Sequence, residues 1–329
     1  MNSQKIVPHI GLLLAVLMAS AAVAQEENAP VLPEVRVGGS AEPAGGAAEG
    51  YRVENARLGP LGERAAQEIP FSVQSISAQF IQNTAAGNST EALKYAPMVY
   101  SNTGGGQITL YFTVRGFSVS TWTYNMALDG MRSFDIWQPM EDKERIEVMS
   151  GAASFLYGIT SPGGMFHYAL KRPLFGAHAS VTLGHYDRQL YTHVDFGGLA
   201  GGREEAGYRV NLGYGDQGRT GVKGMTQERY ALSGALAWKV NADTRIDLDF
   251  SAARREIEQP QALFVVNAAS GLPKPPDTRI NFGAENGNTL DVTRRIGFGL
   301  ESRLGDVFTL RAQARHSGGE RRYLMSRQN

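Results

Sequence analysis

The sequence predicts a mixed α+β domain followed by about seven strands of a transmembrane antiparallel β-barrel, which is incomplete in this chain. Two patterns divide the chain. Between Ile69 and Arg172, short apolar runs alternate with brief helical segments, whereas after Pro173 apolar and polar residues alternate strictly over long stretches. Strict alternation is typical of strands with one apolar face, and runs of about ten residues can cross a bilayer when tilted.

The amino terminus is expected to be a cleaved signal peptide, residues 1–24. Lys5 precedes an apolar run that begins at Ile10, and small residues follow up to Ala24. The run is too short for a membrane-spanning helix, because polar residues from Gln25 onward end it. We therefore expect the protein to be exported.

Residues 25–68 are predicted to form a flexible leader, because they are rich in Ala, Gly, Glu and Pro and contain few large apolar residues. One island in this leader, Val31 to Val37, has the β-branched alternation of an extended segment. Such a segment is suited to add a strand to the edge of another protein's sheet.

The α+β domain is expected to span residues 69–173. Its clearest helix follows Asn88, a favourable N-cap, and has Glu91 three residues further on. The helix is expected to end at Ala96, because Pro97 disfavours helical geometry in the residue before it. Strands are predicted at 110–115, 127–129 and 145–149, separated by turns rich in Gly or Pro.

Residues 174–329 are expected to be barrel strands, each with an apolar face and a polar face. A soluble β-sandwich alternates in the same way, so alternation alone does not distinguish the two folds. The loops favour the barrel. Residues 241–243 and 305–306 are tight turns, whereas 217–228 and 256–288 are long loops, and this asymmetry is typical of outer-membrane barrels.

A sheet of about seven strands in lipid would leave two rows of backbone donors and acceptors unpaired, at several kcal/mol for each group. Such a sheet is not expected to stand alone. The chain is therefore expected to be a fragment, a truncated gene product or a frameshifted copy of a protein whose barrel has about 22 strands.

Composition and motifs argue against several functions. Lys and Arg number 32 and Asp and Glu number 32, so no basic field attracts nucleic acid, and no nucleic acid partner is expected. The absence of cysteine excludes thiolate metal sites, thiol nucleophiles and disulfides. The histidines form no H-E-x-x-H motif, and no G-x-S-x-G motif occurs, so no enzyme, resident metal or cofactor is predicted.

A series of motifs follows in order along the α+β domain. They are Ile69 to Ile76, Glu91 to Val99, Val114-Arg115-Gly116-Phe117, Leu128 to Arg132, and the run from Glu144 to Pro173 that contains Ser161-Pro162-Gly163-Gly164. Together they resemble the plug domain of the TonB-dependent ferric-siderophore receptors of Gram-negative outer membranes. Ser150, Ala152 and residues 166–169 depart from the family's pattern.

The resemblance implies a monomeric outer-membrane receptor, surrounded by lipid, that binds a ferric siderophore outside the cell. The siderophore would move inward when the inner-membrane TonB protein pulls on the plug. The TonB-binding segment, or TonB box, is assigned to Glu34, Val35, Arg36 and Val37. Arg115 and Arg145 correspond to family arginines that latch the plug by pairing with barrel carboxylates, which are expected in strands beyond this chain.

Candidate ligand contacts lie in the plug's outward loops, where aromatic rings offer a large rigid surface to a bulky chelate. They are Gln107, Trp122, Tyr124, Phe134 and Trp137. Packing in the core or against the barrel wall would equally explain these aromatic residues. Two alternatives to siderophore uptake stay open, namely a receptor for another large metal complex such as cobalamin and a non-functional truncated gene product.

Overall fold

The computed structural model describes residues 53, 55–57, 63–69, 71–101, 111–120, 125–133, 137–151, 154–186, 189–217, 222–261, 274, 277, 279–305 and 307–324. The chain divides into two units, Met1–Gly38 and Gly39–Asn329, and every described residue belongs to the second. The predicted signal peptide and the segment from Glu34 to Val37 lie outside the described residues.

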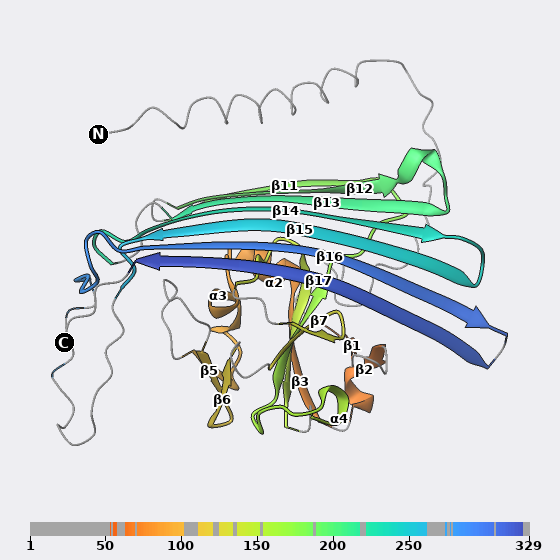
Figure 1. Cartoon of the computed structure of the whole chain (residues 1–329), viewed down its shortest axis with the longest axis horizontal. Coiled ribbons are helices and arrows are strands. Elements are labelled where there is room, and N and C mark those ends of the chain that lie inside the picture. Colours follow the sequence, from red (N-terminus) through yellow and green to blue (C-terminus); the bar gives the residue numbers. More distant parts are fainter. Residues whose placement is uncertain are drawn as a thin grey trace, which may run out of the picture. The chain divides into compact units, whose positions relative to one another are not determined.

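A five-stranded mixed sheet forms the centre of the plug domain (Figure 1). Its order is β3 (Ser72–Ser77), β9 (Lys143–Ser150), β10 (Met165–Leu170), β7 (Met126–Leu128) and β8 (Met131–Arg132). β10 and β7 are parallel, and the other neighbours are antiparallel. Every residue of β9 and β10 is buried, so these two strands carry the core.

Smaller elements surround this sheet. β4 (Val99–Ser101), β5 (Tyr111–Val114) and β6 (Phe117–Ser120) form a three-stranded sheet, and β1 (Asn55–Arg57) pairs with β2 (Glu63–Ala65). The helices are the 3-10 turn η3 (Ala66–Glu68), α2 (Ala78–Asn83), α3 (Ser89–Leu93) and α4 (Ser154–Tyr157). The edge-to-face contact of Phe112 on β5 with Phe166 on β10, at 4.9 Å between ring centroids, joins the two larger sheets in one core.

The predicted N-cap of α3 is confirmed. Asn88 Oδ1 accepts from the Glu91 backbone N–H at 3.0 Å, and the Glu91 carboxylate accepts from the Gly87 N–H at 2.7 Å. The predicted end at Ala96 is wrong, because α3 stops at Leu93. After Leu93 the backbone forms two successive turns instead of α-helix. Ala96 N–H donates to the Leu93 carbonyl and Val99 N–H donates to the Ala96 carbonyl, and these turns lead the chain into β4.

Two motifs of the plug are tight hairpin turns. Arg115 and Gly116 join β5 to β6, and Asp129 and Gly130 join β7 to β8. All four residues have positive φ, at 52°, 86°, 46° and 85°. Positive φ at both central residues is the pattern of a type I′ turn, which explains a glycine at the second position of each.

The second half of the chain is one seven-stranded antiparallel sheet in sequence order. Its strands are β11 (His178–Tyr186), β12 (Gln189–Leu199), β13 (Ala206–Gln217), β14 (Thr226–Lys239), β15 (Thr244–Glu258), β16 (Asn288–Leu304) and β17 (Phe308–Leu324). A 3-10 turn, η5 (Ala200–Gly202), lies between β12 and β13. In the described part of the chain β11 and β17 are the edges, and the sheet is open. This confirms the predicted fold class.

The two faces of this sheet have inverted polarity relative to a soluble domain. Apolar side chains on the outer face are exposed, including Leu183 (72%), Trp238 (50%) and Ile296 (59%). Charged side chains on the inner face are buried against the plug, including Asp195 (1%) and Arg229 (4%). A sandwich would bury the apolar face, so this arrangement agrees with a sheet whose outer face meets lipid.

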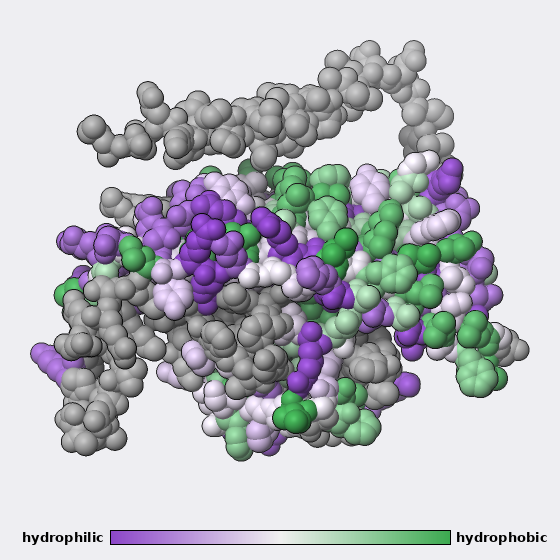
Figure 2. Space-filling model, in the orientation of Figure 1, coloured by the Kyte–Doolittle hydropathy of each residue, from purple (hydrophilic) through white to green (hydrophobic). Residues whose placement is uncertain are grey.

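The apolar surface has a definite height. On β14 the outer face runs from Trp238 to Tyr230, about 27 Å along the strand and about 20 Å along the membrane normal at a typical tilt. Arg254 lies level with Tyr230, and beyond that level the outer face carries Glu228 and Glu256. Figure 2 shows hydrophobic residues gathered over the short-turn end of the sheet and hydrophilic ones toward the long-loop end.

No helix among the described residues is both long enough and apolar enough to cross a membrane.

Candidate functional site: the contact between plug and wall

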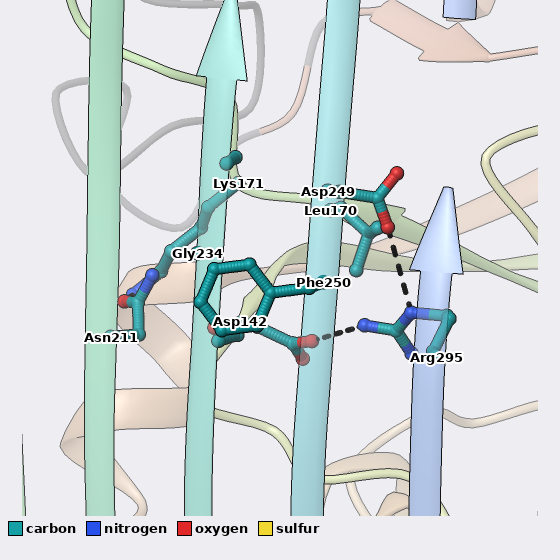
Figure 3. A pocket seen from close by; sticks show the side chains of 10 residues that line it. Asp142, Leu170, Lys171, Asn211, Gly234, Asp249, Phe250 and Arg295 are labelled. Atoms are coloured by element: carbon teal, nitrogen blue, oxygen red, sulfur yellow. Dashed lines mark hydrogen bonds and ion pairs between the residues drawn. The ribbon is translucent and has the colours of Figure 1, made fainter. Parts of the chain in front are cut away.

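A buried acidic segment of the plug faces the inner face of the seven-stranded sheet, which is called the wall below. Glu141 and Asp142 precede β9, and Glu144 lies at its start, all between 3% and 4% exposed. Arg229 on β14 pairs with Glu141, and Arg295 on β16 donates to Asp142 at 2.5 Å (Figure 3). Arg209 on β13 lies 3.8 Å from Glu144. Arginines on three strands therefore hold one short plug segment.

The strand period explains why these arginines converge. Arg209, Arg229 and Arg295 all point to the inner face, because each alternates with an outward apolar neighbour. Glycines let the plug approach closely: a Cβ on Gly213 would lie 2.5 Å from Glu141 Cγ, and one on Gly215 would lie 2.6 Å from Arg229 Nε. A larger residue at either position would push the ion pair apart.

Lys171 makes a second contact at the end of the plug. Its Nζ donates to Asp195 Oδ2 on β12 at 2.8 Å and to Asn211 Oδ1 on β13 at 3.0 Å. Arg209 also donates two hydrogen bonds to the Asp195 carboxylate, from Nε at 2.9 Å and from Nη2 at 2.8 Å. Burial, opposed by Asp195, lowers the pKa of Lys171 below its usual value.

The type I′ turn at Asp129 makes a third contact, with β17. Arg315 donates to the Leu128 carbonyl at 2.8 Å and to Asp249 at 3.1 Å, and it lies 3.6 Å from Asp129. Arg172 pairs with the same Asp129 at 3.2 Å. The hairpin is therefore held from both the plug side and the wall side.

A small cavity of about 20 Å³ lies inside this contact, lined by Asp142, Lys171, Asp249 and Arg295 (Figure 3). Leu170 and Phe250 also line it, and its size suits one water molecule. Asp249 and Arg295 face each other across 3.7 Å, too far for a direct hydrogen bond. The contact between plug and wall is therefore polar and incompletely packed at this point.

The charges around Asp142 stabilise the contact between plug and wall, and they still allow the plug to separate from the wall. Burial alone would raise the pKa of this carboxyl, but Lys143 and Arg295 together hold the pKa below its usual value of 3.8. A buried charge is stable only while it is paired, so losing one partner is costly. Separation of whole ion pairs into water is much less costly, because water solvates both charges.

The two predicted latch arginines lie elsewhere on the plug. Arg115 is exposed in the turn between β5 and β6, and a Cβ on Gly151 would lie 3.6 Å from its guanidinium. Arg145 is buried on β9, and its Nε donates to Glu147 Oε1 at 2.7 Å. Pairing of either arginine with a barrel carboxylate stays a prediction.

Glu147 also joins Arg145 to a buried histidine. His167 Nδ1 lies 2.7 Å from Glu147 Oε2, and its Nε2 accepts from the Gly130 N–H at 2.9 Å. Since Gly130 can only donate, the proton lies on Nδ1 and is donated to Glu147. Burial opposes ionisation of Glu147, but His167 and Arg145 lower its pKa overall.

Of the candidate ligand contacts, only Trp137 lies within the described residues, and Gln107, Trp122, Tyr124 and Phe134 lie outside them. Trp137 is 1% exposed, and Arg255 of β15 stacks over its ring at 5.4 Å. The ligand role of all five residues stays a prediction.

Sequence reasoning did not identify the acidic segment or its arginine partners. Two signals were present, the charged run from Glu141 to Arg145 and the arginines at inward positions of alternating strands. Neither signal predicts which strand meets which carboxylate, because the pairs are up to 153 residues apart in sequence.

Among the described residues, no group of three or more His, Asp or Glu side chains is arranged to hold a metal ion.

Comparisons with known proteins agree with this architecture. Residues 65–165 match the TonB-dependent Receptor Plug Domain. The chain is 34% identical over 196 residues to the Ferrioxamine B receptor of Salmonella typhimurium, covering 55% of the chain and 27% of the relative. It is 26% identical over 286 residues to the Ferrichrome outer membrane transporter/phage receptor of Escherichia coli K12, covering 83% and 38%.

Solved structures show the same fold. The ferric preacinetobactin receptor BauA of Acinetobacter baumannii superimposes with a TM-score of 0.76 at 24% identity, over 86% of this chain and 42% of that one. The chain thus spans well under half the length of these proteins. Residues 65–165 thus carry the plug domain of TonB-dependent receptors, and together with the sheet that follows the chain is similar to part of these longer proteins.

Proposed function

We propose that the protein carrying this chain is an outer-membrane receptor that takes up a ferric siderophore with energy supplied by TonB. The observation that carries the proposal is the buried pairing of Glu141 and Asp142 with Arg229 and Arg295. Buried ion pairs hold the plug against the wall in the absence of force, and they can separate into water when a force pulls on the plug. The siderophore-receptor relatives support the ligand class.

TonB is the proposed partner because no nucleotide is available at the outer membrane, so work must arrive through a mechanical link. The proposed handle is Glu34 to Val37, whose alternation suits addition of a strand to a partner's sheet. A cleaved signal peptide over residues 1–24 would deliver the protein to the envelope. The exposed apolar outer face of β14 supports insertion in lipid. The receptor is proposed to be a monomer surrounded by outer-membrane lipid.

The test is growth on individual ferric siderophores. The complete gene product and a variant lacking Glu34 to Val37 are expressed in an iron-uptake-deficient strain, with equal amounts verified in the outer-membrane fraction. We expect growth on at least one ferric siderophore, and loss of that growth in the deletion variant while binding of the same chelate persists. Equal growth of both strains on every iron source would contradict TonB-coupled uptake.

A further inference from the structure

The imidazole of His167 joins the plug core to the type I′ turn at Asp129 and Gly130. His167 lies on β10 and is fully buried. Its Nε2 accepts from the Gly130 N–H at 2.9 Å, and its Nδ1 donates to Glu147 on β9 at 2.7 Å. It is one of residues 166–169, where the sequence departs from the pattern of TonB-dependent receptors. Uptake as proposed above does not use this buried titratable group.

The same turn contacts the wall. The Leu128 carbonyl, one residue before the turn, accepts from Arg315 on β17 at 2.8 Å. The Asp129 carboxylate lies 3.6 Å from Arg315, and it accepts from the Leu170 N–H at 3.1 Å. A movement of the turn would therefore disturb the contact between plug and wall at β17.

The hydrogen bond from Gly130 depends on the charge of the imidazole. Nε2 accepts through its lone pair, and this lone pair is present only while His167 is neutral. A proton on Nε2 would place two N–H groups face to face, with 2.9 Å between the nitrogens. The closed turn therefore excludes this proton, whereas a turn that has moved away admits it. By linkage, a fall in pH favours the moved turn.

The charges around the ring allow the imidazolium to form once the turn has moved. Glu147 Oε2 contacts the ring, and Glu147 Oε1 accepts from Arg145 Nε at 2.7 Å. The charged groups around the ring and the turn are Glu147 and Arg145 on β9, Asp129 in the turn, Arg172 after β10, Arg315 on β17, and Asp247 and Asp249 on β15. Carboxyl groups ordinarily lose their charge near pH 4 and guanidinium groups keep theirs, so a response between about pH 7.5 and about pH 5 points to the imidazole.

We propose that His167 is a proton switch: protonation of its imidazole releases the turn at Asp129 and Gly130 from the plug core and thereby weakens the contact of the plug with β17. The role of this switch in uptake rests on the proposed function, because displacement of the plug is the step that it eases. Glu147 pairs with the imidazolium after release, so the plug core keeps its fold. Acid therefore loosens one turn and its wall contact, and neutral pH restores both.

The test is hydrogen exchange of the intact outer-membrane protein in detergent at about pH 7.5 and about pH 5. Mass spectrometry follows residues 126–133, with rates corrected for the intrinsic pH dependence of amide exchange. Exchange at the imidazole C2, followed in the same samples, reports the protonation of His167. The variant His167→Gln places an oxygen where it can accept from Gly130, and it does not titrate. His316→Gln is the matched control, because it makes the same change at an exposed position on the outer face of β17.

We expect the corrected exchange of residues 126–133 in the wild type to be about threefold to thirtyfold faster at the lower pH, because an accessible imidazole binds its proton near pH 6.5. The midpoint of this change should coincide with the midpoint of C2 exchange at His167. The amides of β9 should keep their protection, since only the turn is released. His167→Gln should exchange slowly at both pH values, and His316→Gln should respond as the wild type does.

Equal corrected exchange of residues 126–133 in the wild type at the two pH values would overturn the switch. The same acid response in His167→Gln would also overturn it, because another group such as Asp129 would then be the sensor. If His167→Gln does not fold, the wild-type midpoints carry the test, and different midpoints overturn the switch. An acid response of the turn in a protein that supports no growth on any ferric siderophore would contradict the proposed function and the role in uptake, while the switch itself would stand.

Discussion

Replacing Asp142 with Asn tests whether the buried ion pairs hold the plug against the wall. The substitution keeps size and polarity but leaves Arg295, with a side chain 6% exposed, without its 2.5 Å carboxylate partner, and the buried Lys143 loses the same partner. Removing one member of a buried pair typically costs about 3–5 kcal/mol. We expect a value near the lower limit, about 3 kcal/mol, because Asn still accepts a hydrogen bond and the adjacent cavity of about 20 Å³ admits water.

Hydrogen exchange of the β9 amides measures this effect. All eight residues of β9 are buried, so their amides exchange only when the plug opens or leaves the wall. A loss of about 3 kcal/mol corresponds to roughly a hundredfold faster exchange. Arg254→Gln is the control, since its pair with Glu256 is solvent-exposed on the outer face and should change exchange by less than about threefold.

The double variant Asp142→Asn with Arg295→Gln sharpens the result. The double variant no longer leaves a charged Arg295 without this carboxylate, and Lys143 loses Asp142 equally in the single and the double variant, so the double variant should be less destabilised than the sum of the single changes. The reasoning is refuted if β9 protection is unchanged in Asp142→Asn, or if the two single changes are additive.

The other predictions concern the pH dependence of stability, the contact made by Lys171, and two glycines of the plug. Because the pKa of Asp142 is lowered, ionised Asp142 contributes to the free energy of unfolding above about pH 4, and this contribution is lost as the pH falls through the lowered pKa. In Asp142→Asn the free energy of unfolding, measured by tryptophan fluorescence, should therefore fall less steeply as the pH is lowered. Lys171→Met should speed β9 exchange by at least about tenfold, since Asp195 and Asn211 lose a donor, and an exchange rate equal to that of the wild type contradicts the role given to Lys171. Gly164→Ala should prevent stable plug folding, because the new Cβ would lie 1.8 Å from the Met149 carbonyl oxygen at φ +113°. Gly116→Ala, with positive φ and no atom nearby, should cost only about 1–2 kcal/mol in thermal unfolding, and equal effects of the two changes would show that the close contact is unimportant.

Local signals predicted many elements correctly. Asn88 followed by Glu91 indicated the start of α3, and the alternation after Pro173 indicated seven long strands. The end of α3 was mispredicted, because the chain must turn at Leu93 to deliver Val99 to the three-stranded sheet. Pro97 disfavours helical geometry at Ala96, but it does not require the helix to extend as far as Ala96.

The candidate site was less predictable than the fold. Inward positions of the strands could be read from the alternation, so Arg209 and Arg295 were recognisable as members of the polar face. Their partners were not, because Asp142 and Glu144 lie in a different domain and are brought into range only by the packing of β9 against the sheet. The stacking of Arg255 on Trp137 is equally invisible in the sequence, because it depends on which residues surround a side chain in the fold.

The sequence by itself determined the order of a compact α+β domain and a long antiparallel sheet, because turn chemistry and strand period act between neighbours along the chain. Only the tertiary structure decided that plug carboxylates meet wall arginines and that Arg255 of the wall covers the ring of Trp137 on the plug. Charge attraction and hydrogen bonding act over a few ångströms in space, and folding alone sets which distant residues come that close.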